Sequence, residues 1–265
     1  MTIGLPEAIT KQVFDTLSVL KHHLGEAIQA IYLFGSAIHG GLKPFSDIDL
    51  LVTINAPLDD TTRAALMSEL LSVSAPPGTD LIRRALEVTV LAQEDVLPWR
   101  YPAKRQMQFG EWLRDDINLG IYEPAMTDHD LAILLTKVRR HSLALYGPAA
   151  QEYFNEIPAI DIQRSLLDTL ALWNTESDWE GDERNIILAL VRIWYTATTE
   201  DIASKDDAAN WALGRLPVEC QQIVAAARDG YLGLEVPDLV GFPKEREMLL
   251  NHIRSNVIAI LRQKI

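Results

Sequence analysis

The stretch that decides the fold is YLFGSAIHGGLKPFSDIDLLV, residues 32–52. An apolar run ends at Gly35-Ser36, a loop follows, and Asp47 and Asp49 then interrupt a second apolar run. A buried carboxylate is costly unless it is paired or bound to a cation. Residues i and i+2 of a strand share one face, so we expect both aspartates to point the same way. A divalent cation would relieve their repulsion, and Mg²⁺ prefers carboxylate and phosphate oxygens.

The glycine and serine before this loop suit a phosphate. Gly35-Ser36 follows a predicted strand and is expected to open a short helix. Free backbone N–H groups at such a point, together with the Ser36 hydroxyl, can bind phosphate oxygens. Either motif alone is common in proteins without a ligand site, so the prediction depends on their combination.

Composition bounds the class of protein. The 265 residues are 48% hydrophobic with a mean hydropathy of +0.03, which is enough for a folded core. The net charge of −13 argues against a DNA or RNA partner, because nucleic-acid binders usually carry a basic stripe. The single cysteine, Cys220, excludes an internal disulfide. The chain shows neither a membrane-spanning run nor a signal core, so we expect a cytoplasmic protein without membrane contact.

Hydrophobic periodicity predicts an α/β domain followed by a helical one. Strands are expected near residues 30–34, 47–54 and 84–91, and helices over 9–24 and 59–73, the second capped near Asp60 or Thr61. Residues 128–147 are expected to form one long helix. After a linker, only helices are predicted, over about 162–173, 183–198, 205–213, 218–230 and 244–265. The expected domains are residues 1–157, with a mixed sheet and flanking helices, and residues 158–265, an all-α helical bundle.

The histidines do not predict a metal site. His22 and His23 lie at a predicted helix end, and His141 lies within a predicted helix. None of them has a metal-ligand spacing with another histidine or cysteine.

The spacing of the first motif resembles that of a known superfamily. Phe34-Gly35-Ser36, ten intervening residues and then Asp47-Ile48-Asp49-Leu50 are similar to the signature of the DNA-polymerase-β-like nucleotidyltransferases. That superfamily often has a third acid on a neighbouring strand, and RRALEVTVL offers Glu87. Glu87 could bind metal or act as the general base, which must reach the hydroxyl it deprotonates. The alternative is a solvent-facing glutamate on an edge strand.

Longer segments narrow the resemblance. LEVTVL, WRYPAKRQMQFGEWLRDDI, LALYGPAA, WNTESDWEGDERNIILALVRIWYT and IASKDDAANWAL look like the AadA-type aminoglycoside (3'')(9)-adenylyltransferases. The resemblance covers nearly the whole chain. It implies a Mg²⁺-dependent transfer of AMP from ATP to the 3''-hydroxyl of streptomycin and the 9-hydroxyl of spectinomycin, and hence antibiotic resistance. Two magnesium ions and a monomeric protein are expected.

An acidic and aromatic segment is the predicted drug site. WNTESDWEGDE, residues 173–183, has five acids, two tryptophans and no basic residue. Streptomycin carries guanidinium groups, which pair with carboxylates and stack on tryptophan. The resemblance implies that Trp173, Asp178, Asp182 and Trp112 touch the drug, and Asn185 could join them. The alternative is a solvated acidic loop in which Asp182 caps the next helix.

The ATP contacts are expected from both predicted domains. The triphosphate would lie over Gly35-Ser36 and Ser46. SKDDAANW resembles a capping box at Ser204, which puts Lys205 in the first helical turn, where a bound anion would offset the unfavourable helix dipole. Lys205 could instead be an ordinary solvated lysine.

Two further residues could serve ATP or the fold. Arg192 could reach phosphate or cover the core with its stem. Tyr231 could pack on adenine or belong to the core.

The expected mechanism has Glu87 accept a proton from the drug hydroxyl, which attacks the α-phosphorus while pyrophosphate leaves. We expect the helical domain to close with ATP bound first. Two rivals remain open. One is a nucleotidyltransferase with a protein acceptor, and the other is a non-catalytic nucleotide-sensing module.

Overall fold

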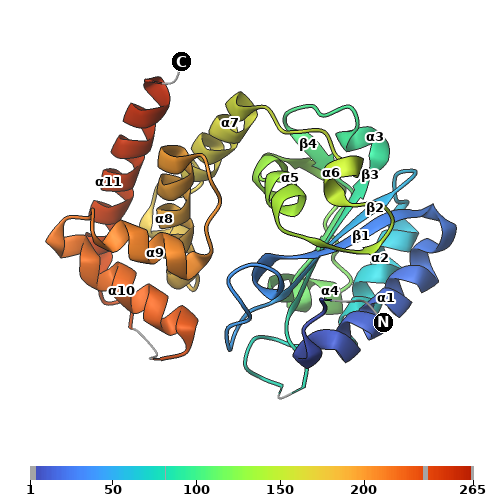
Figure 1. Ribbon diagram of the computed structural model, residues 1–265. Coiled ribbons are helices and arrows are strands. Elements are labelled where there is room, and N and C mark those ends of the chain that lie inside the picture. Colours follow the sequence, from blue (N-terminus) through green and yellow to red (C-terminus); the bar gives the residue numbers. More distant parts are fainter. Residues whose placement is uncertain (1–3, 81, 235–237, 264–265) are drawn as a thin grey trace. The chain divides into compact units, whose positions relative to one another are not determined.

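The computed structural model describes residues 4–80, 82–234 and 238–263. The chain divides into two compact units, Met1–Pro158 and Ala159–Ile265. The first unit combines a sheet with helices and the second contains helices (Figure 1). The predicted class, an α/β domain followed by an all-α domain, is confirmed.

The main sheet of the first unit is mixed. Its order is β5-β3-β2-β1-β7, in which β2 and β3 are parallel and the other neighbours antiparallel. The strands are β1 (Ile28–Phe34), β2 (Ile48–Ile54), β3 (Leu86–Ala92), β5 (Met107–Phe109) and β7 (Leu143–Tyr146). Because β3 lies between β2 and β5, the alternative that placed Glu87 on an edge strand is wrong.

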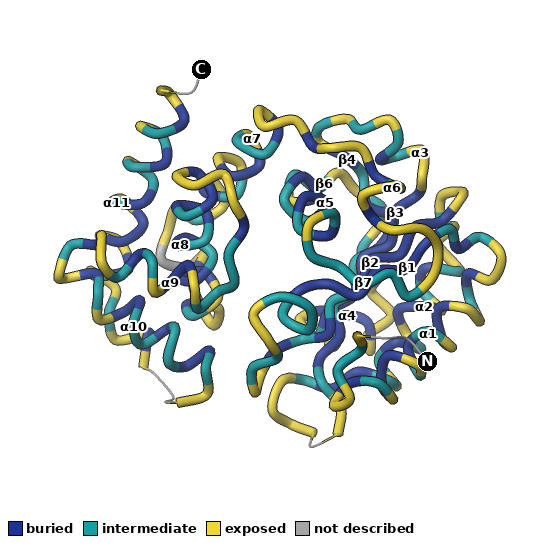
Figure 2. Tube along the Cα trace, viewed as in Figure 1, coloured by how far each residue is buried: buried dark blue, intermediate teal, exposed yellow. Residues whose placement is uncertain are grey.

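Helices α1 (Glu7–Leu24) and α2 (Asp60–Leu70) bury their apolar stripes in one core with the sheet. The strand residues of this core alternate along the chain, as in Leu50 and Val52 of β2. Figure 2 shows most of β1, β2 and β3 as buried. The cap of α2 is Asp59, one residue before the predicted position, and its Oδ1 accepts a hydrogen bond from the Thr62 N–H at 2.8 Å.

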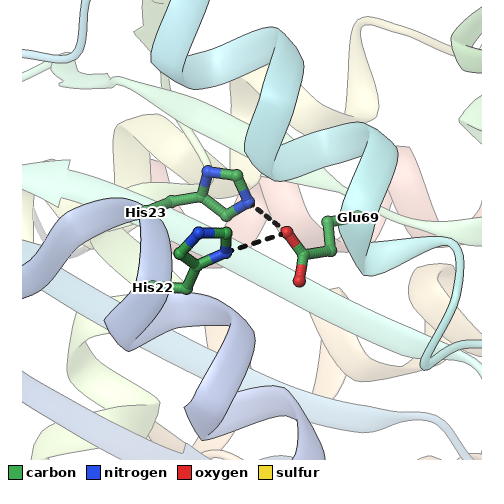
Figure 3. A group of neighbouring side chains, drawn as sticks. All are labelled: His22, His23 and Glu69. Carbon is green, nitrogen blue, oxygen red and sulfur yellow. Dashed lines mark hydrogen bonds and ion pairs between the residues drawn. The ribbon is translucent and has the colours of Figure 1, made fainter.

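A side-chain group that the sequence did not predict joins α1 to α2. His22 and His23 of α1 both contact the Glu69 carboxylate of α2 (Figure 3). The sequence shows no metal-ligand spacing between these histidines and another histidine or cysteine. Their partner is instead a carboxylate, 46 residues after His23 in the chain.

The predicted long helix over residues 128–147 is wrong. Helix α5 covers only Leu131–Arg140, and β7 follows it along the free edge of β1. Leu143 and Leu145 pack against the core of the unit, which fits the period of a strand as well as that of a helix. Pairing with β1 satisfies the backbone hydrogen bonds of this segment, and this favours a strand over a helix.

Short elements complete the first unit, and most are too brief for periodicity to predict. A second sheet pairs β4 (Ala103–Arg105) with β6 (Met126–Asp128). The remaining pieces are η1 (Gly25–Ala27), η2 (Gly35–Ala37), α3 (Gln93–Val96), η3 (Glu111–Leu113), α4 (Arg114–Asn118) and α6 (Ala150–Tyr153).

The second unit packs around one apolar helix. Its elements are α7 (Ala159–Leu170), η4 (Glu176–Trp179), α8 (Glu183–Thr199), α9 (Lys205–Leu213), α10 (Val218–Leu232) and α11 (Pro243–Arg262). Helix α8 contacts α7, α9, α10 and α11, and Ile187, Leu188 and Val191 are fully buried on it. A helix that is apolar on most sides belongs in the middle of a bundle. Over the described ranges, no helix combines the length and apolarity needed to span a bilayer.

Candidate active site

The acids of the first motif and Glu87 lie on neighbouring strands in one register. Asp49 pairs with Phe34 of β1 on one side and with Glu87 of β3 on the other. Paired residues of adjacent strands project to the same face, so the two carboxylates are neighbours across the ladder. Asp47 lies one residue before the first residue of β2, two residues from Asp49.

This face of the sheet is opposite to the one covered by α1 and α2. Leu50 and Val88, which follow Asp49 and Glu87, belong to the core beneath those helices. Strand alternation therefore directs the two acids to the other side. Asp47, Asp49 and Glu87 are all partly buried, whereas their neighbours Ile48, Leu50, Leu86 and Val88 are buried.

Gly35 allows the chain to pass directly over Asp49. It has a φ of +72°, in the left-handed region, and it is buried. A Cβ at this position would lie 2.5 Å from the Asp49 Cγ and would overlap Oδ2. The expected short helix is here a single 3₁₀ turn, η2, closed by hydrogen bonds from the Ile38 and His39 N–H groups to the Gly35 carbonyl at 3.1 and 2.9 Å. Ser36 is partly exposed in this turn.

Ser46 closes the tight turn that leads into the acids. The Lys43 N–H donates to Ser46 Oγ at 2.9 Å, and the Ser46 N–H donates to the Lys43 carbonyl at 3.1 Å. Only 6% of Ser46 is exposed. Its oxygen accepts within the turn, and a serine hydroxyl can also donate, so the contact with phosphate stays a prediction.

Gln108 of β5 supports Glu87. It pairs with Thr89 one strand away, and its Nε2 donates to Glu87 Oε1 at 3.4 Å. This long hydrogen bond orients the carboxylate without covering it, because Glu87 remains partly exposed. A carboxylate oriented in this way can accept a proton from a hydroxyl in reach.

Trp112 presents an exposed aromatic face next to the sheet. It lies in η3 and is 59% exposed, an unusual position for so large an apolar side chain. Its ring lies against the backbone of Gly110, where a Cβ would meet the ring carbons Cζ3 and Cη2. The absence of a side chain at Gly110 thus makes room for the indole.

In the second unit, the predicted drug residues form two local groups. Asp178 Oδ2 accepts hydrogen bonds from the Asn174 and Thr175 N–H groups at 2.8 and 2.7 Å. The bond from Thr175, followed by that from Asn174, holds the pKa of Asp178 below its usual value. Trp173, partly buried just before them, uses its carbonyl to accept from Arg254 at 2.8 Å.

The second group is a pair of exposed polar side chains at the start of α8. Asn185 Nδ2 donates to Asp182 Oδ1 at 2.7 Å. Asp182 occupies the N-cap position, but its side chain makes no capping hydrogen bond to the helix. The alternative in which the Asp182 carboxylate caps α8 is therefore not realised.

Not all members of the acidic segment face the same way. Glu183 is buried, and its Oε1 accepts from Arg246 at 3.3 Å. The guanidinium of Arg246 also lies 5.8 Å from the centre of the Trp179 ring, which is 4% exposed. Glu183 and Trp179 thus serve the core of the helical unit, because burial of an acid requires a paired cation.

The expected cation of the helical unit lies where the capping box predicts it. Ser204 is the N-cap of α9 and accepts from the Asp207 N–H at 3.2 Å. Lys205 follows as the first helical residue, with its Nζ 5.4 Å from the centre of the Tyr231 ring. Tyr231 is 8% exposed, which favours the core alternative over a platform for adenine. Arg192 is partly buried on α8, two turns after Asn185.

Comparison with known proteins matches both units. Residues 16–97 match the family "Polymerase beta, Nucleotidyltransferase", and residues 152–255 match "Aminoglycoside adenylyltransferase, C-terminal domain". An aminoglycoside (3'') (9) adenylyltransferase of Escherichia coli is 50% identical over 253 residues, covering 96% of each chain. The chain belongs to the aminoglycoside (3'')(9)-adenylyltransferase family.

Other members of this adenylyltransferase family are also similar to the chain. A spectinomycin 9-adenylyltransferase of Staphylococcus aureus (strain Mu50 / ATCC 700699) is 42% identical over 225 residues, covering 85% of this chain and 86% of its own. The crystal structure of spectinomycin adenyltransferase AAD(9) from Enterococcus faecialis with ATP and spectinomycin superposes with a TM-score of 0.85. It shares 28% sequence identity and covers 94% of this chain and 99% of its own.

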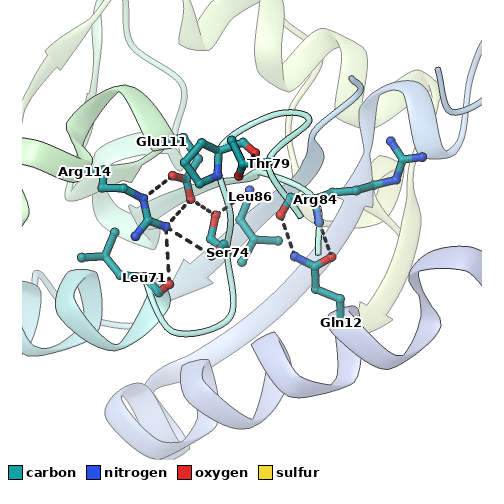
Figure 4. Close-up of polar contacts among 9 residues, drawn as sticks. Gln12, Leu71, Ser74, Thr79, Arg84, Leu86, Glu111 and Arg114 are labelled. Atoms are coloured by element: carbon teal, nitrogen blue, oxygen red, sulfur yellow. Dashed lines mark hydrogen bonds and ion pairs between the residues drawn. The ribbon is translucent and has the colours of Figure 1, made fainter. Parts of the chain in front are cut away.

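The sequence did not predict a network of hydrogen bonds that supports the backbone of the adenylyltransferase site. Arg84 Nη1 donates to the carbonyls of Lys43 and Ser46 at 2.8 and 3.0 Å, so it pins the turn before Asp47. Gln12 of α1 in turn accepts from the Arg84 N–H at 2.9 Å and donates to its carbonyl at 2.7 Å (Figure 4). A glutamine within an amphipathic helix carries no signal for this role.

A second part of the same network supports η3 and the start of β3. The Leu86 N–H donates to Ser74 Oγ at 3.1 Å, and Ser74 Oγ donates to Glu111 (Figure 4). Arg114 closes the group with two hydrogen bonds to Glu111, at 2.5 and 2.9 Å. These contacts tie the strand that carries Glu87 to the turn that carries Trp112.

A cation and two histidines near the Gly35 turn were also missed. Lys137 of α5 lies with its Nζ 5.2 Å from the centre of the Phe34 ring, the register neighbour of Asp49. His39, which follows η2, stacks on His141 with ring centroids 4.2 Å apart and planes 11° apart. The helix predicted through His141 concealed this contact, because α5 ends at Arg140.

Proposed function

We propose that the chain transfers AMP from ATP to the 3''-hydroxyl of streptomycin and to the 9-hydroxyl of spectinomycin, and thereby confers resistance to both drugs. The observation that carries the chemistry is the register of Asp49 with Glu87, beside a glycine that lets the chain pass over Asp49. Two relatives support the choice of acceptor. One, at 50% identity, is named an aminoglycoside (3'') (9) adenylyltransferase, and the other, at 42% identity, a spectinomycin 9-adenylyltransferase.

Asp47, Asp49 and Glu87 are the proposed Mg²⁺ ligands, and we propose two ions. The side chains fit such ions because they offer only carboxylate oxygens, the donors that Mg²⁺ prefers. Three partly exposed acids at one end of the sheet would otherwise repel one another. Bound Mg²⁺ would neutralise the triphosphate oxygens and polarise the α-phosphate. Counting bound Mn²⁺ by electron paramagnetic resonance, with ATP present, tests the number of ions.

Glu87 is the proposed general base. In this step the drug oxygen forms a bond to the α-phosphorus, the bond from that phosphorus to the pyrophosphate oxygen breaks, and the hydroxyl proton passes to Glu87. The hydrogen bond from Gln108 supports this role, because it orients the carboxylate while an oxygen remains accessible. Positioned bases of this kind contribute typically about 10²–10⁴-fold to the rate.

Gly35, Ser36, Lys205 and Arg192 are the proposed phosphate contacts. Gly35 brings backbone directly against the Asp49 carboxylate, and Ser36 follows it in the same turn with a partly exposed side chain. Lys205 is supported by its place as the first residue of α9, where the helix dipole favours an anionic partner. Arg192 is partly buried and lies on the same helix as Asn185, which supports its assignment as a phosphate contact.

Ser46 and Tyr231 are the remaining proposed ATP contacts, and each also positions a neighbouring residue. Ser46 shapes the turn before Asp47 through its bond from the Lys43 N–H. Tyr231 supports the Lys205 ammonium with its ring. Each would affect ATP binding through the neighbour that it holds.

Trp112, Trp173, Asp178, Asp182 and Asn185 are the proposed drug contacts. Trp112 offers an exposed ring, and the Asp182–Asn185 pair offers an exposed polar group that can bind amines or guanidinium. Asp178 keeps its charge through its backbone hydrogen bonds, so it can both hold its turn and attract a cation. Trp173 would present a flat face to the same part of the drug.

Drug-dependent release of pyrophosphate tests the whole proposal. The purified chain is mixed with ATP and Mg²⁺, with streptomycin, with spectinomycin, or without a drug. We expect pyrophosphate and adenylylated drug only when a drug is present, and none from the Asp49→Ala variant. Release that ignores the drug, or ATP binding without turnover, would instead favour a protein acceptor or a nucleotide-sensing module.

We propose further that the protein acts as a monomer and uses no nucleic acid. The net charge of −13 supports the second part, since it repels phosphate backbones. Light scattering of the purified chain and its absorbance ratio at 260 and 280 nm test both parts.

A further inference from the structure

Helices α1 and α2 meet at three side chains with metal-ligating atoms. His23 Nε2 lies 2.6 Å from Glu69 Oε2, and His22 Nδ1 lies 3.2 Å from the same oxygen (Figure 3). All three ligating atoms lie within 4.8 Å of one another. Both helices cover the face of the sheet that is opposite to Asp49 and Glu87, so this group is separate from the proposed active site.

The packing of α1 and α2 in the core fixes the backbone that carries this group. His22 and His23 lie in the last turn of α1, which ends at Gly25, and Glu69 lies near the end of α2. Leu20 of α1 and Leu66 of α2 are fully buried below them in the core. The end of one helix is therefore fixed against the end of the other, and the side chains add no further backbone cost when they bind a ligand.

The three side chains differ in solvent exposure, and the two more exposed ones have more room to adjust to an ion. The His23 side chain is only 14% exposed, while those of His22 and Glu69 are 70% and 39% exposed. The same Glu69 oxygen, Oε2, contacts both imidazoles. One imidazole is thus preset, and the other two groups can rotate by small amounts to reach an ion.

The donor set selects a class of ion. Two imidazole nitrogens and one carboxylate oxygen form a common ligand set of Zn²⁺, at distances of about 2.0–2.2 Å, with a fourth position left for water. Imidazole ligands also suit Cu²⁺, Ni²⁺ and Co²⁺, whereas Mg²⁺ prefers oxygen ligands alone. The group therefore differs in selectivity from the acids on the other face of the sheet.

We propose that His22, His23 and Glu69 bind one Zn²⁺-class divalent ion, which links the end of α1 to the end of α2. The ion lies between the two imidazole nitrogens and the Glu69 carboxylate, and water completes its coordination. Binding stabilises the first unit, because the folded chain brings together ligands that are far apart in the unfolded chain.

Calorimetric titration with ZnCl₂ tests the proposal. The full chain is freed of metal with a chelator and carries Asp47→Ala and Asp49→Ala, so that the active-site acids do not compete. We expect one saturable Zn²⁺ per chain, a higher melting temperature with Zn²⁺, and no such effect from MgCl₂. Absence of saturable binding in this background overturns the proposal.

Variants of the ligands locate the ion. His23→Ala and Glu69→Ala in the same background should each weaken Zn²⁺ binding by at least about tenfold, since even indirect partners of metal ligands typically matter by 10–100-fold. His22→Ala repeats the test at a side chain too exposed to disturb the core. Unchanged affinity in all three variants shows that the ion binds elsewhere.

A matched control is available in the same unit. His129 also faces a carboxylate, with its Nε2 3.5 Å from Asp130 Oδ1, but it is not part of the three-ligand group. His129→Ala should therefore leave Zn²⁺ affinity unchanged. An equal loss in His129→Ala and in His23→Ala would reveal a general effect of histidine removal and would overturn the assignment.

Discussion

Replacement of Gly35 by alanine tests whether the Asp49 carboxylate must lie against the backbone that follows β1. The new Cβ would lie 2.5 Å from Asp49 Cγ, whereas ordinary contacts begin at 3.4 Å. The carboxylate carbon would therefore have to move by at least about 0.9 Å, and Oδ2, which the Cβ would overlap, by more. We expect Gly35→Ala to lose about 10²-fold in kcat/KM, since a misplacement of about 1 Å can cost that much.

The cost in stability is predicted separately. Alanine in the left-handed region costs about 1–2 kcal/mol. A domain with a free energy of unfolding of about 5–15 kcal/mol remains folded after such a loss. We thus expect a folded variant that is nearly inactive, and urea denaturation measures the first part of this expectation.

Gly120→Ala is the matched control. Gly120 has a φ of +75°, close to that of Gly35, but a Cβ there meets nothing within 4 Å. Both variants therefore carry the same backbone cost, and only Gly35→Ala moves Asp49. Pyrophosphate release with ATP, Mg²⁺ and spectinomycin is the assay. Equal activity of the two variants would refute the reasoning, because the loss would then come from backbone strain alone or would not occur.

Three further predictions concern the reacting base and the drug site. Glu87→Gln should bind ATP and drug normally in calorimetry but turn over about 10²–10⁴-fold more slowly, and loss of ATP binding would leave Glu87 only its proposed role as a metal ligand. Gly110→Ala should displace Trp112 and raise KM for the drug without changing KM for ATP; equal changes in both would show a general distortion. Asp178→Ala should lose streptomycin resistance and largely keep spectinomycin resistance, because the loss of one charge-assisted bond costs about 1.5–3 kcal/mol. Asp182→Asn should reduce resistance to both drugs. Growth of cells on each drug alone measures both outcomes.

The long helices were predictable from the chain because their apolar stripes repeat over many residues. The helices predicted over residues 9–24 and 183–198 correspond to α1 and α8, each within two residues at both ends. Strands β4, β5 and β6 were not predicted, because three residues are too few to show a period. Strand β7 was mistaken for the end of a helix, since its apolar residues fit both periods and only the open edge of β1 distinguishes them.

The roles of single polar residues were harder to predict than the elements that carry them. Glu183 was counted with an acidic surface, but its side chain pairs with Arg246, which is 63 residues away in the chain. The hydrogen bond that Ser46 Oγ accepts from the Lys43 N–H was not predicted either. In each case the partner is chosen by packing, because a buried polar group must find whichever partner the fold brings near.

The sequence by itself determined that Asp47 and Asp49 lie two residues apart at the start of a strand, after a glycine that can turn the chain, although β2 begins at Ile48, one residue later than predicted. That much is local, because strand alternation acts on neighbouring residues. Only the tertiary structure decided that Glu87 lies in register with Asp49, that Gly35 leaves room for the Asp49 carboxylate, and that His22 and His23 share Glu69. These contacts join segments far apart in the chain. Their positions follow from strand register and helix packing, which are set by burial of the whole core and not by spacing within any one segment.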